Sequence, residues 1–484
     1  MIRPRKKVTE TEWNKTIDRL ADGSLTLFGL WGDGADVYMA HLNERTGDIA
    51  VVTYTCKDGK YPSVAAKHPP AIRLERAIRD LFGLDAESAP DTRTWLDLGK
   101  WDLRHPLGES EVAQMPAPYV FLPAEGEGLH QIPVGPVHAG IIEPGHFRFT
   151  ASGEHVVRLE QRLGYVHKGI EKLMIGATID NAARLSGRTS GDSTVAYAFA
   201  FAQAAESALN VKAPPRAVYL RALMAELERL ANHFGDIGAI CNDASFAMMH
   251  AQTGILRERM LRTAAACFGH RLMMDAIMPG GVARDIAPDG LVQVRELLAE
   301  LRRVFPRLVE LYDSTASLQD RTVTTGIVKP HYARQFGAGG YVGRASGRDF
   351  DARRTPGYAP YGELTFDVPV LNDGDVNARV WIRIREVEQS LLLIDQILDH
   401  LPGGDVTASL QLTAGEGLGL VEAFRGDVLV WLRLDGKGCV ERCHLRDASW
   451  FQWPLLEAAV DGNIVADFPI CNKSFNCSYS GHDL

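Results

Sequence analysis

The side chains that could carry chemistry gather in one polar turn, Arg184-Leu-Ser-Gly-Arg-Thr-Ser-Gly191, which combines two arginines with three hydroxyl groups. A helical segment rich in charge precedes this turn, and the apolar, Ala-rich run 193–205 follows it. A polar turn between two packed helices costs free energy to bury unless it faces a partner, a cofactor or a cavity. The turn is therefore a candidate functional site. A solvated loop followed by a buried helix is the alternative that its spacing leaves open.

Three other groups of residues have the chemistry of a site but less informative spacing. His138 and His146 lie in a Gly/Pro-rich loop and could contact a ligand, but a metal site would need further ligands that the sequence does not identify. The glycine-rich segment 337–343 lacks the G-x-G-x-x-G order of a dinucleotide site and is predicted to be an irregular loop. A dense group of charges is predicted to form a solvated or intersubunit surface: Asp349, Asp351, Arg353 and Arg354.

The composition is that of a soluble globular protein, with 46% hydrophobic and 23% charged residues, and the 484-residue length allows two or three domains. The net charge of −9 gives no electrostatic reason to expect nucleic acid or an anionic membrane as a partner. The sequence has no apolar run long enough for a transmembrane helix and no apolar signal segment near its basic N-terminus, which favours the cytosol. None of the 7 cysteines forms a C-x-x-C pair, so neither a disulfide framework nor a self-contained zinc or iron–sulfur site is expected.

The N-terminal quarter has the pattern of a small α+β module. Thr9 and Glu12 have the spacing of a capping box, and the helix that they start carries Trp13, Ile17 and Leu20 on one face. Strand-like runs follow at 25–30, 35–42 and 49–55, and then a helix at 71–82. The segment 113–128 is rich in Pro, Gly and small residues and is predicted to be a linker, so that the module ends near Met115.

The rest of the chain is predicted to be mainly helical. Helices are expected from Pro215 onward, at 254–276, at 291–312 with a kink at Pro306, and at 376–398. The last of these has a regular apolar stripe: Val376, Val380, Ile384, Val387, Leu391, Ile394 and Leu398. Its charged residues lie off the stripe: Arg379, Arg383, Arg385, Glu386 and Glu388. From Gly417 onward, strand-like runs are predicted to alternate with turns.

Several segments in this order resemble one family, the 49-kDa subunit of respiratory complex I, which is related to the large subunit of nickel–iron hydrogenases. The first three are Gly135-Pro-Val-His138, Gly164-Tyr-Val-His-Lys-Gly-Ile-Glu-Lys-Leu173 and the helix 214–229. The match continues through these segments: Pro279–Arg284, Gly343–Gly347, Gly374–Arg379 and Glu422–Gly426. Agreement in order over so many segments is more specific than any single motif.

The N-terminal module resembles the 30-kDa subunit of complex I through Glu75-Arg-Ala-Ile-Arg-Asp-Leu-Phe-Gly83 and His105-Pro-Leu-Gly108. This fusion is of the formate hydrogenlyase and hydrogenase-4 large-subunit type. The resemblance implies a 30-kDa-like α+β domain at 1–115, a linker at 116–130, and at 131–484 a mainly α-helical domain with peripheral β elements. The fold class is therefore α+β.

The resemblance also implies a function and an environment. The chain would be a peripheral-arm core subunit of an energy-converting complex of the NADH:quinone oxidoreductase or hydrogenase-4 type. A small partner subunit would carry a 4Fe–4S cluster, antiporter-like membrane subunits would move ions, and the complex would lie on the cytoplasmic face of the inner or plasma membrane. The alternative role is that of a non-catalytic coupling or scaffold subunit. A third candidate role is that of an active nickel–iron hydrogenase large subunit.

The sequence departs from the hydrogenases at all four cysteines that hold nickel and iron. The family's first motif, R-x-C-G-x-C, has Ser186 and Thr189 at its cysteine positions, and the final D-P-C-x-x-C aligns with Ser478 and Gly481 there. Neutral hydroxyl groups do not replace bridging thiolates. We therefore expect no nickel–iron centre and no other cofactor on this chain.

Complex I's quinone contacts are also incomplete, because Gly187 stands at the position of the quinone-binding tyrosine and Ile142 at that of the second histidine. His138 remains, which keeps quinone as a candidate acceptor. The pocket candidates are His138, Glu143, Arg184, Ser186, Arg188, Thr189 and Ser478. The resemblance places His167 and Lys168 toward the partner's cluster, where a cation would raise the cluster's reduction potential. The alternative is that Lys168, Arg184 and Arg188 pair with Glu143 or Glu171 in a structural network.

Overall fold

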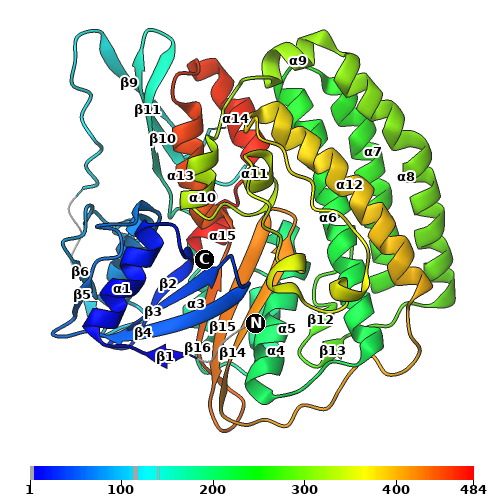
Figure 1. Ribbon diagram of the computed structural model, residues 1–484, viewed down its shortest axis with the longest axis horizontal. Helices are drawn as coiled ribbons and strands as arrows, with labels where there is room; N and C mark the ends of the chain where they lie inside the picture. Colours follow the sequence, from blue (N-terminus) through cyan, green and yellow to red (C-terminus); the bar gives the residue numbers. More distant parts are fainter. Residues whose placement is uncertain (1–4, 113–117, 139, 141) are drawn as a thin grey trace.

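The computed structural model describes residues 5–112, 118–138, 140 and 142–484, and Figure 1 shows an N-terminal α+β module beside a larger, mainly helical body. The main sheet of the module has the strand order β1-β4-β3-β2. The module's elements are β1 (Lys6–Lys7), α1 (Glu10–Ala21), β2 (Thr26–Asp33), β3 (Asp36–Asn43), β4 (Asp48–Thr55), β5 (Lys60–Pro62), α2 (Ile72–Phe82), β6 (Asp85–Glu87), β7 (Leu103–Arg104) and β8 (Glu111–Val112).

The start of α1 shows why the predicted module forms. The hydroxyl of Thr9 accepts from the Glu12 backbone N–H, and the Glu12 carboxylate accepts from the Thr9 backbone N–H at 2.9 Å, which completes the capping box. Trp13, Ile17 and Leu20 are buried against the sheet, as their spacing predicts. The predicted module boundary near Met115 falls in 113–117, outside the described residues, and stays a prediction.

The module shares its core with the C-terminal half of the chain. Trp31 of β2 packs against Trp431 of β15 (Gly426–Leu434), with ring centroids 5.7 Å apart, and stacks on His444 of β16 (Val440–Arg446) at 4.6 Å. The Arg446 guanidinium donates to the carbonyl of Phe28 at 2.6 Å. Figure 1 shows the orange hairpin lying alongside the blue sheet of the module. Burial of aromatic rings from both parts therefore fixes their relative position.

The body begins with an antiparallel sheet and continues with long helices (Figure 1). The sheet comprises β9 (Leu129–Val134), β10 (His146–Ser152) and β11 (His155–Arg162). The helices that follow are α3 (Ile170–Met174), α4 (Ile179–Ser186), α5 (Thr194–Leu209), α6 (Pro215–Asp243), α7 (Ala247–Phe268), α8 (Pro288–Ser314), α9 (Ala316–Thr322), α10 (Pro330–Gln335), α11 (Gly340–Ala345) and α12 (Val376–Asp399). The remaining elements are β12 (Ile277–Met278), β13 (Gly281–Val282), β14 (Gly415–Ala423), β15, β16, α13 (Ser449–Val460), α14 (Phe468–Phe475) and α15 (Tyr479–Asp483).

The apolar helix α5 packs closely on β14 because both surfaces consist of small residues. A Cβ atom at Gly417 would lie 2.0 Å from the carbonyl oxygen of Ala204, and one at Gly419 would lie 2.0 Å from that of Ala200. Only glycine on the strand allows this approach of helix to sheet. The apolar run after the polar turn is thus a buried helix, as the sequence predicts, and it anchors the turn to the core.

The C-terminal tail departs from the sequence prediction, because helices α13, α14 and α15 replace the strands expected after Arg446. Trp450, Phe451 and Trp453 are buried on different sides of α13. A short segment that is apolar all round has no clear period, so periodicity does not separate a buried helix from a buried strand there. This error matters for function, because α15 carries Ser478 as its N-cap.

The charged residues of α12 lie off its apolar stripe, but not all of them face solvent. The apolar stripe is buried as expected, but Arg379, Arg383 and Glu386 are each at most 1% exposed. Asp351 and Arg353, predicted at a surface, are at most 2% exposed, whereas Arg354 is exposed. These residues belong to a buried group that we call the ionic core: Glu226, Arg229, His233, Arg344, Asp351, Arg353, Glu386 and Glu422.

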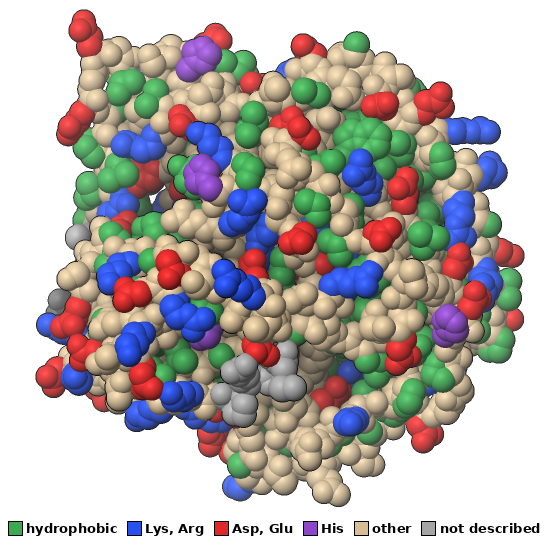
Figure 2. Space-filling view, viewed as in Figure 1, with side chains coloured by type: hydrophobic (Ala, Val, Ile, Leu, Met, Phe, Trp, Pro, Cys, Tyr) green, Lys and Arg blue, Asp and Glu red, His purple; other side chains and the backbone are tan. Residues whose placement is uncertain are grey.

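The glycine-rich segment 337–343 is only in part the irregular loop that the sequence predicts, because residues 340–343 begin helix α11. A Cβ atom at Gly340 would lie 2.0 Å from the carbonyl oxygen of Arg425, so close packing requires glycine there. Acidic and basic side chains are interspersed over the face seen in Figure 2, so the charge there is mixed and not of one sign. Among the described residues, every helix is too short or too polar to span a lipid bilayer.

Candidate functional site

The polar turn and the C-terminal segment meet, although 288 positions separate them in the chain. The hydroxyl oxygens of Ser190 and Ser478 lie 2.9 Å apart. Ser186 ends α4, and its carbonyl accepts from the Thr189 backbone N–H at 3.1 Å. Ser478 caps α15, where its hydroxyl oxygen accepts from the Gly481 N–H at 2.9 Å. We call Ser186, Thr189, Ser190 and Ser478 the polar cluster; all four are at most 4% exposed.

An ion pair fastens this cluster to the β14–β15 turn. The Ser190 hydroxyl donates to Asp192 at 2.9 Å, and Arg425 binds the same carboxylate through Nη1 at 2.8 Å. Arg425 also donates from Nε to the carbonyl of Asn476 at 2.5 Å. Three distant segments are thus joined by one guanidinium. Asp192 and Arg425 were not predicted as site residues from the sequence, although Arg425 lies in the segment Glu422–Gly426 that carries the family resemblance.

The four positions at which the resemblance places the cysteines of the hydrogenases do not fit a nickel–iron centre. The Ser186 hydroxyl donates to the Ala183 carbonyl of its own helix at 2.7 Å. A Cβ atom at Gly481 would lie 2.7 Å from the Asp447 carboxylate, which Tyr197 holds through its hydroxyl at 2.9 Å. The space that a fourth ligand would need is therefore filled by a carboxylate, and the other three donors are hydroxyl groups, which bind soft metals weakly.

Cys477 does not supply the missing thiolate. It precedes Ser478, its side chain is buried against Gln452, and burial raises the pKa of its thiol. Among the described residues, no three histidine, cysteine or acidic side chains converge in the way that a metal ion requires. The Thr189 hydroxyl, in contrast, is buried without a hydrogen-bond partner, which leaves one polar atom of the cluster unused.

Lys168 connects the polar turn to a surface pocket. Its ammonium group donates to the carbonyls of Arg188 at 3.0 Å and Thr189 at 2.7 Å. Burial lowers the pKa of this ammonium group, although the carboxylates of Glu143 and Asp483 oppose the shift. The cation predicted from the resemblance is therefore held directly against the backbone of the polar turn.

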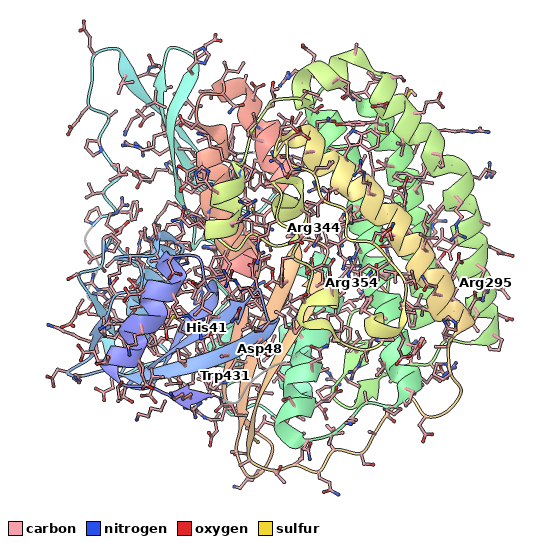
Figure 3. The ribbon with its side chains drawn as sticks, in the orientation of Figure 1. His41, Asp48, Arg295, Arg344, Arg354 and Trp431 are labelled. Atoms are coloured by element: carbon pink, nitrogen blue, oxygen red, sulfur yellow. The ribbon has the colours of Figure 1, made fainter. Side chains whose placement is uncertain are left out.

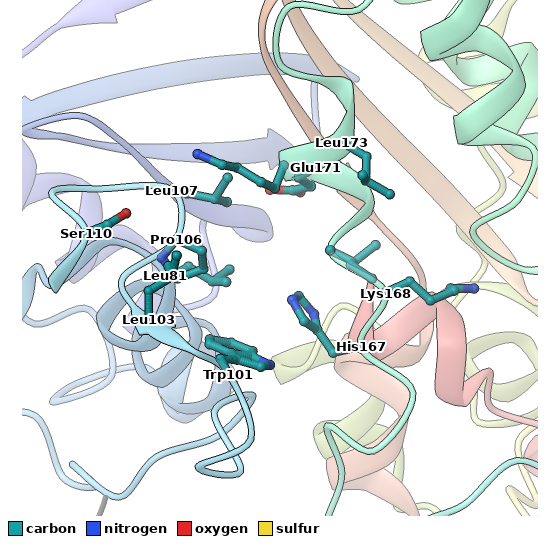
Figure 4. Close-up of a pocket in the computed structure, with 13 residues that line it drawn as sticks. Leu81, Trp101, Leu103, Pro106, Leu107, Ser110, His167, Lys168, Glu171 and Leu173 are labelled. Atoms are coloured by element: carbon teal, nitrogen blue, oxygen red, sulfur yellow. The ribbon is translucent and has the colours of Figure 1, made fainter. Parts of the chain in front are cut away.

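The pocket has a volume of about 380 Å³ and is formed by the N-terminal module on one side and the 167–173 segment on the other (Figure 4). His167 lies beside Trp101, with ring centroids 4.9 Å apart, and faces Leu81 and Leu107 of the module. The His167 ring donates from Nδ1 to the Asp483 carbonyl at 2.7 Å, because a carbonyl can only accept. Its Nε2 atom is then the acceptor that the ring offers to a bound group.

The remaining cations and carboxylates do not form the network considered as an alternative. Arg188 pairs with Asp275, with the closest atoms 2.5 Å apart, and Arg184 is exposed. Glu171 is buried between Arg442 at 2.8 Å and His444 at 2.9 Å. Glu143 accepts from the Ser480 backbone N–H at 3.0 Å, so it positions the segment that carries Ser478. Arg188, Glu171 and Glu143 therefore each have a different partner.

His138 lies apart from the polar cluster. Its ring packs edge-on against Phe147, and a row of rings continues through Trp453 to Tyr479, next to Ser478. The His138 Nε2 atom is buried without a partner, and burial lowers the pKa of the ring.

A Cβ atom at Gly187 would lie 2.9 Å from the Thr194 hydroxyl oxygen, so a larger side chain there would need Thr194 to move. The structure thus joins Ser186, Thr189, Ser478, Gly481, Glu143 and Lys168, while Arg184 and Arg188 face outward.

The chain is similar to known proteins along most of its length. The family described as "Respiratory-chain NADH dehydrogenase, 49 Kd subunit" matches residues 243–411 and 406–483, and the corresponding 30 Kd family matches residues 12–115. Formate hydrogenlyase subunit 5 of Escherichia coli (strain K12) is 34% identical over 88% of this chain and 77% of the relative. Hydrogenase-4 component G of the same organism is 32% identical over 88% and 76%.

A solved structure agrees with this similarity. The structure described as the membrane-bound sulfane sulfur reductase, an archaeal respiratory membrane complex, contains a chain that superimposes with a TM-score of 0.70 at 26% identity. The match covers 74% of this chain and 99% of the other. The mixed α+β architecture expected from the sequence is therefore shared with a subunit of a respiratory membrane complex.

Proposed function

This chain belongs to the family that includes the 49-kDa and 30-kDa subunits of respiratory-chain NADH dehydrogenase and subunits of membrane-bound hydrogenases, and we propose that it works there without a nickel–iron centre of its own. Members of the family are core subunits of membrane-bound, energy-converting oxidoreductase complexes. The chain is accordingly a core subunit of such a complex. The observation that carries the proposal is the contact between Ser190 and Ser478, which brings the turn that carries Ser186 and Thr189 against Ser478. Hydroxyl groups therefore stand at three of the four positions that the resemblance assigns to cysteine.

The pocket beside His167 and Lys168 is the surface on which a small iron–sulfur subunit would dock. Leu173 at its rim is 57% exposed and nearby Ile175 is 41% exposed, which is unusual for large apolar side chains unless a partner covers them. Lys168 supplies a positive charge next to this surface. The partner would carry a 4Fe–4S cluster, antiporter-like subunits would form the membrane arm, and the assembly would lie on the cytoplasmic face of the membrane.

Replacing Lys168 by methionine is expected to lower the midpoint potential of the partner's cluster. The reduced cluster carries one more negative charge than the oxidised cluster, so a nearby cation stabilises the reduced form. The measurement is a redox titration of the cluster's electron paramagnetic resonance signal in the purified complex. Lys212→Met, which removes an exposed lysine that does not line this pocket, is the control. An unchanged midpoint potential in Lys168→Met would show that the charge of Lys168 does not act on the partner's cluster.

The environment of His138 favours the hypothesis that this chain lines a redox cavity over the hypothesis that its role is purely structural. Its Nε2 atom is buried and unpartnered, so a quinone head group or another acceptor could bind it by a hydrogen bond. With that acceptor bound, His138 would orient it. Electron transfer itself would come from the partner's cluster.

Replacing His138 by alanine should therefore reduce quinone reduction by the complex about 5- to 30-fold, because one hydrogen bond to a head group contributes roughly 1–2 kcal/mol. His130→Ala, at an exposed position on the preceding strand β9, serves as the control. A rate equal to that of the wild type would instead support the coupling or scaffold role, in which the closed polar cluster transmits movement between subunits.

A further inference from the structure

The loop 164–168 carries His167 and Lys168, and its backbone is fastened to the carboxylate of Asp483 in α15. One oxygen of this carboxylate, Oδ2, accepts from the Gly164 N–H at 2.9 Å and from the Val166 N–H at 3.0 Å. Asp483 is 0% exposed, so water does not compete for these bonds. A hydrogen bond from a backbone N–H to an ionised carboxylate is stronger than one between neutral groups. The side chain of Asp483 therefore holds the loop just before His167.

The backbone next to this side chain holds the two functional residues themselves. The His167 ring donates from Nδ1 to the Asp483 carbonyl at 2.7 Å, and the Lys168 backbone N–H donates to the backbone oxygen of Leu484 at 3.0 Å. The Gly169 N–H donates to the same oxygen at 3.0 Å. Figure 4 shows His167 and Lys168 on this segment beside the pocket. Residues 483 and 484 thus fix the backbone from which both side chains extend.

The orientation of Asp483 is set by its neighbour His482. The indole N–H of Trp95, a residue of the N-terminal module, lies 3.3 Å from His482 Nε2 and can only donate, so Nε2 is the acceptor. The proton of the neutral ring is then on Nδ1, which donates to Asp483 Oδ1 at 2.8 Å. Burial lowers the pKa of His482 and keeps the ring neutral, although Asp483 acts in the opposite direction. Both carboxylate oxygens are therefore engaged, and the series of bonds begins in the module.

The module also confines the loop from the other side. A Cβ atom at Gly164 would lie 3.0 Å from the Trp95 carbonyl oxygen and 3.2 Å from that of Leu96. The backbone there is itself fixed, because the Asp80 carboxylate accepts from the N–H groups of Trp95 at 2.6 Å and Leu96 at 2.7 Å. The loop is thus held between Asp483 and the module.

The charge of Asp483 acts on Lys168 as well. Burial lowers the pKa of the Lys168 ammonium group, and the Glu143 and Asp483 carboxylates oppose this shift. Asp483 therefore contributes in two ways. It fixes the segment that carries Lys168, and it favours the charged form of that side chain.

We propose that Asp483 is a positioning residue, whose carboxylate holds the 164–168 loop so that His167 and Lys168 face the partner's iron–sulfur subunit. This inference rests on the function proposed above and gives Asp483 a part in it that acts through Lys168. Asparagine has the same shape as aspartate and tests the chemistry of the carboxylate. Its NH2 group would face either the His482 N–H or the N–H groups of the loop, so that a donor would meet a donor.

Nitrogen-15 nuclear magnetic resonance of the full chain with labelled histidines tests the positioning without the partner. In the wild type, His167 should carry its proton on Nδ1, and His167→Gln identifies its signals. Asp483→Asn should give a mixture of the two neutral tautomers of His167, because the loop loses its anchors at Gly164 and Val166. Asp461→Asn, which changes an exposed aspartate, should leave the signals unchanged. A wild-type His167 protonated on Nε2, or an Nδ1–H form that persists in Asp483→Asn, would overturn the proposal.

A redox titration of the partner's cluster in the purified complex tests the effect on function. The shift in midpoint potential that Lys168→Met causes should fall by about half or more when Asp483→Asn is also present, because residues that act together are not additive. In the Asp461→Asn background the shift should keep its full size. The same shift with and without Asp483→Asn would show that Asp483 supports only the fold, and would refute its positioning role.

Failure of the proposed function gives a different result. If Lys168→Met shifts the midpoint potential in neither background, the electrostatic role proposed for Lys168 is wrong. An Nδ1–H form of His167 that is lost only in Asp483→Asn would then still support Asp483 as the residue that holds the loop.

Discussion

Replacing Arg344 by methionine should lower the free energy of unfolding by about 3–5 kcal/mol, the largest effect that we expect from a single substitution in this chain. Arg344 faces Glu386 at 2.7 Å, Glu422 at 2.8 Å and Asp351 at 3.5 Å. Methionine fills much of the same volume but removes the charge. The carboxylates would then be buried with too few counterions, and some would have to take up protons.

Chemical denaturation of the full chain measures this effect, and two arginines serve as controls (Figure 3). Arg295→Met removes an exposed pair with Asp399, and Arg354→Met removes an exposed charge next to the ionic core. Exposed pairs contribute little because water screens them. If Arg344→Met is no more harmful than these two variants, the ionic core does not stabilise the fold in the way described here.

Replacing Asp192 by asparagine should cost about 3 kcal/mol and loosen the polar cluster. The Arg425 side chain is only 4% exposed and would lose its counterion, whereas Asp192 itself is 36% exposed, which reduces the effect through solvent screening. Ser190 would also lose its charged acceptor. Because Arg425 joins the turn to Asn476, we expect faster amide hydrogen exchange at 186–193 and at 476–484.

The matched control is Asp275→Asn, the same substitution at the other aspartate that pairs with an arginine near this turn. The pair of Arg188 and Asp275 is 39% and 41% exposed, so its loss should be close to neutral. Equal exchange rates in Asp192→Asn and Asp275→Asn would mean that the Arg425 pair does not hold the two segments together.

Local pattern was sufficient for much of the fold. The spacing of Trp13, Ile17 and Leu20, together with a capping box, predicts α1, and the structure has the helix with these residues buried. The run after the polar turn is apolar and Ala-rich, and it is buried as α5. These elements were predictable because the interactions that form them lie within a few residues in the chain.

The buried charges could not be predicted in the same way. Periodicity places Arg383 and Glu386 off the apolar stripe of α12, where a solvated face is the ordinary expectation. Their partners, Asp236 and Arg344, come from other elements, and Arg383 lies 147 positions from Asp236. The same limit applies to Gly481, because the Asp447 carboxylate that fills its surroundings belongs to a distant segment. Only the folded chain shows that the former metal position is closed.

The metal content of the complex purified through this chain tests the central claim most directly. A subunit with hydroxyl groups at three former cysteine positions and a carboxylate filling the space at the fourth should bring iron, from the partner's cluster, and no nickel. Elemental analysis should therefore find nickel far below one atom per copy of the chain, with or without Ser478→Ala. Stoichiometric nickel that disappears in Ser478→Ala would contradict this account.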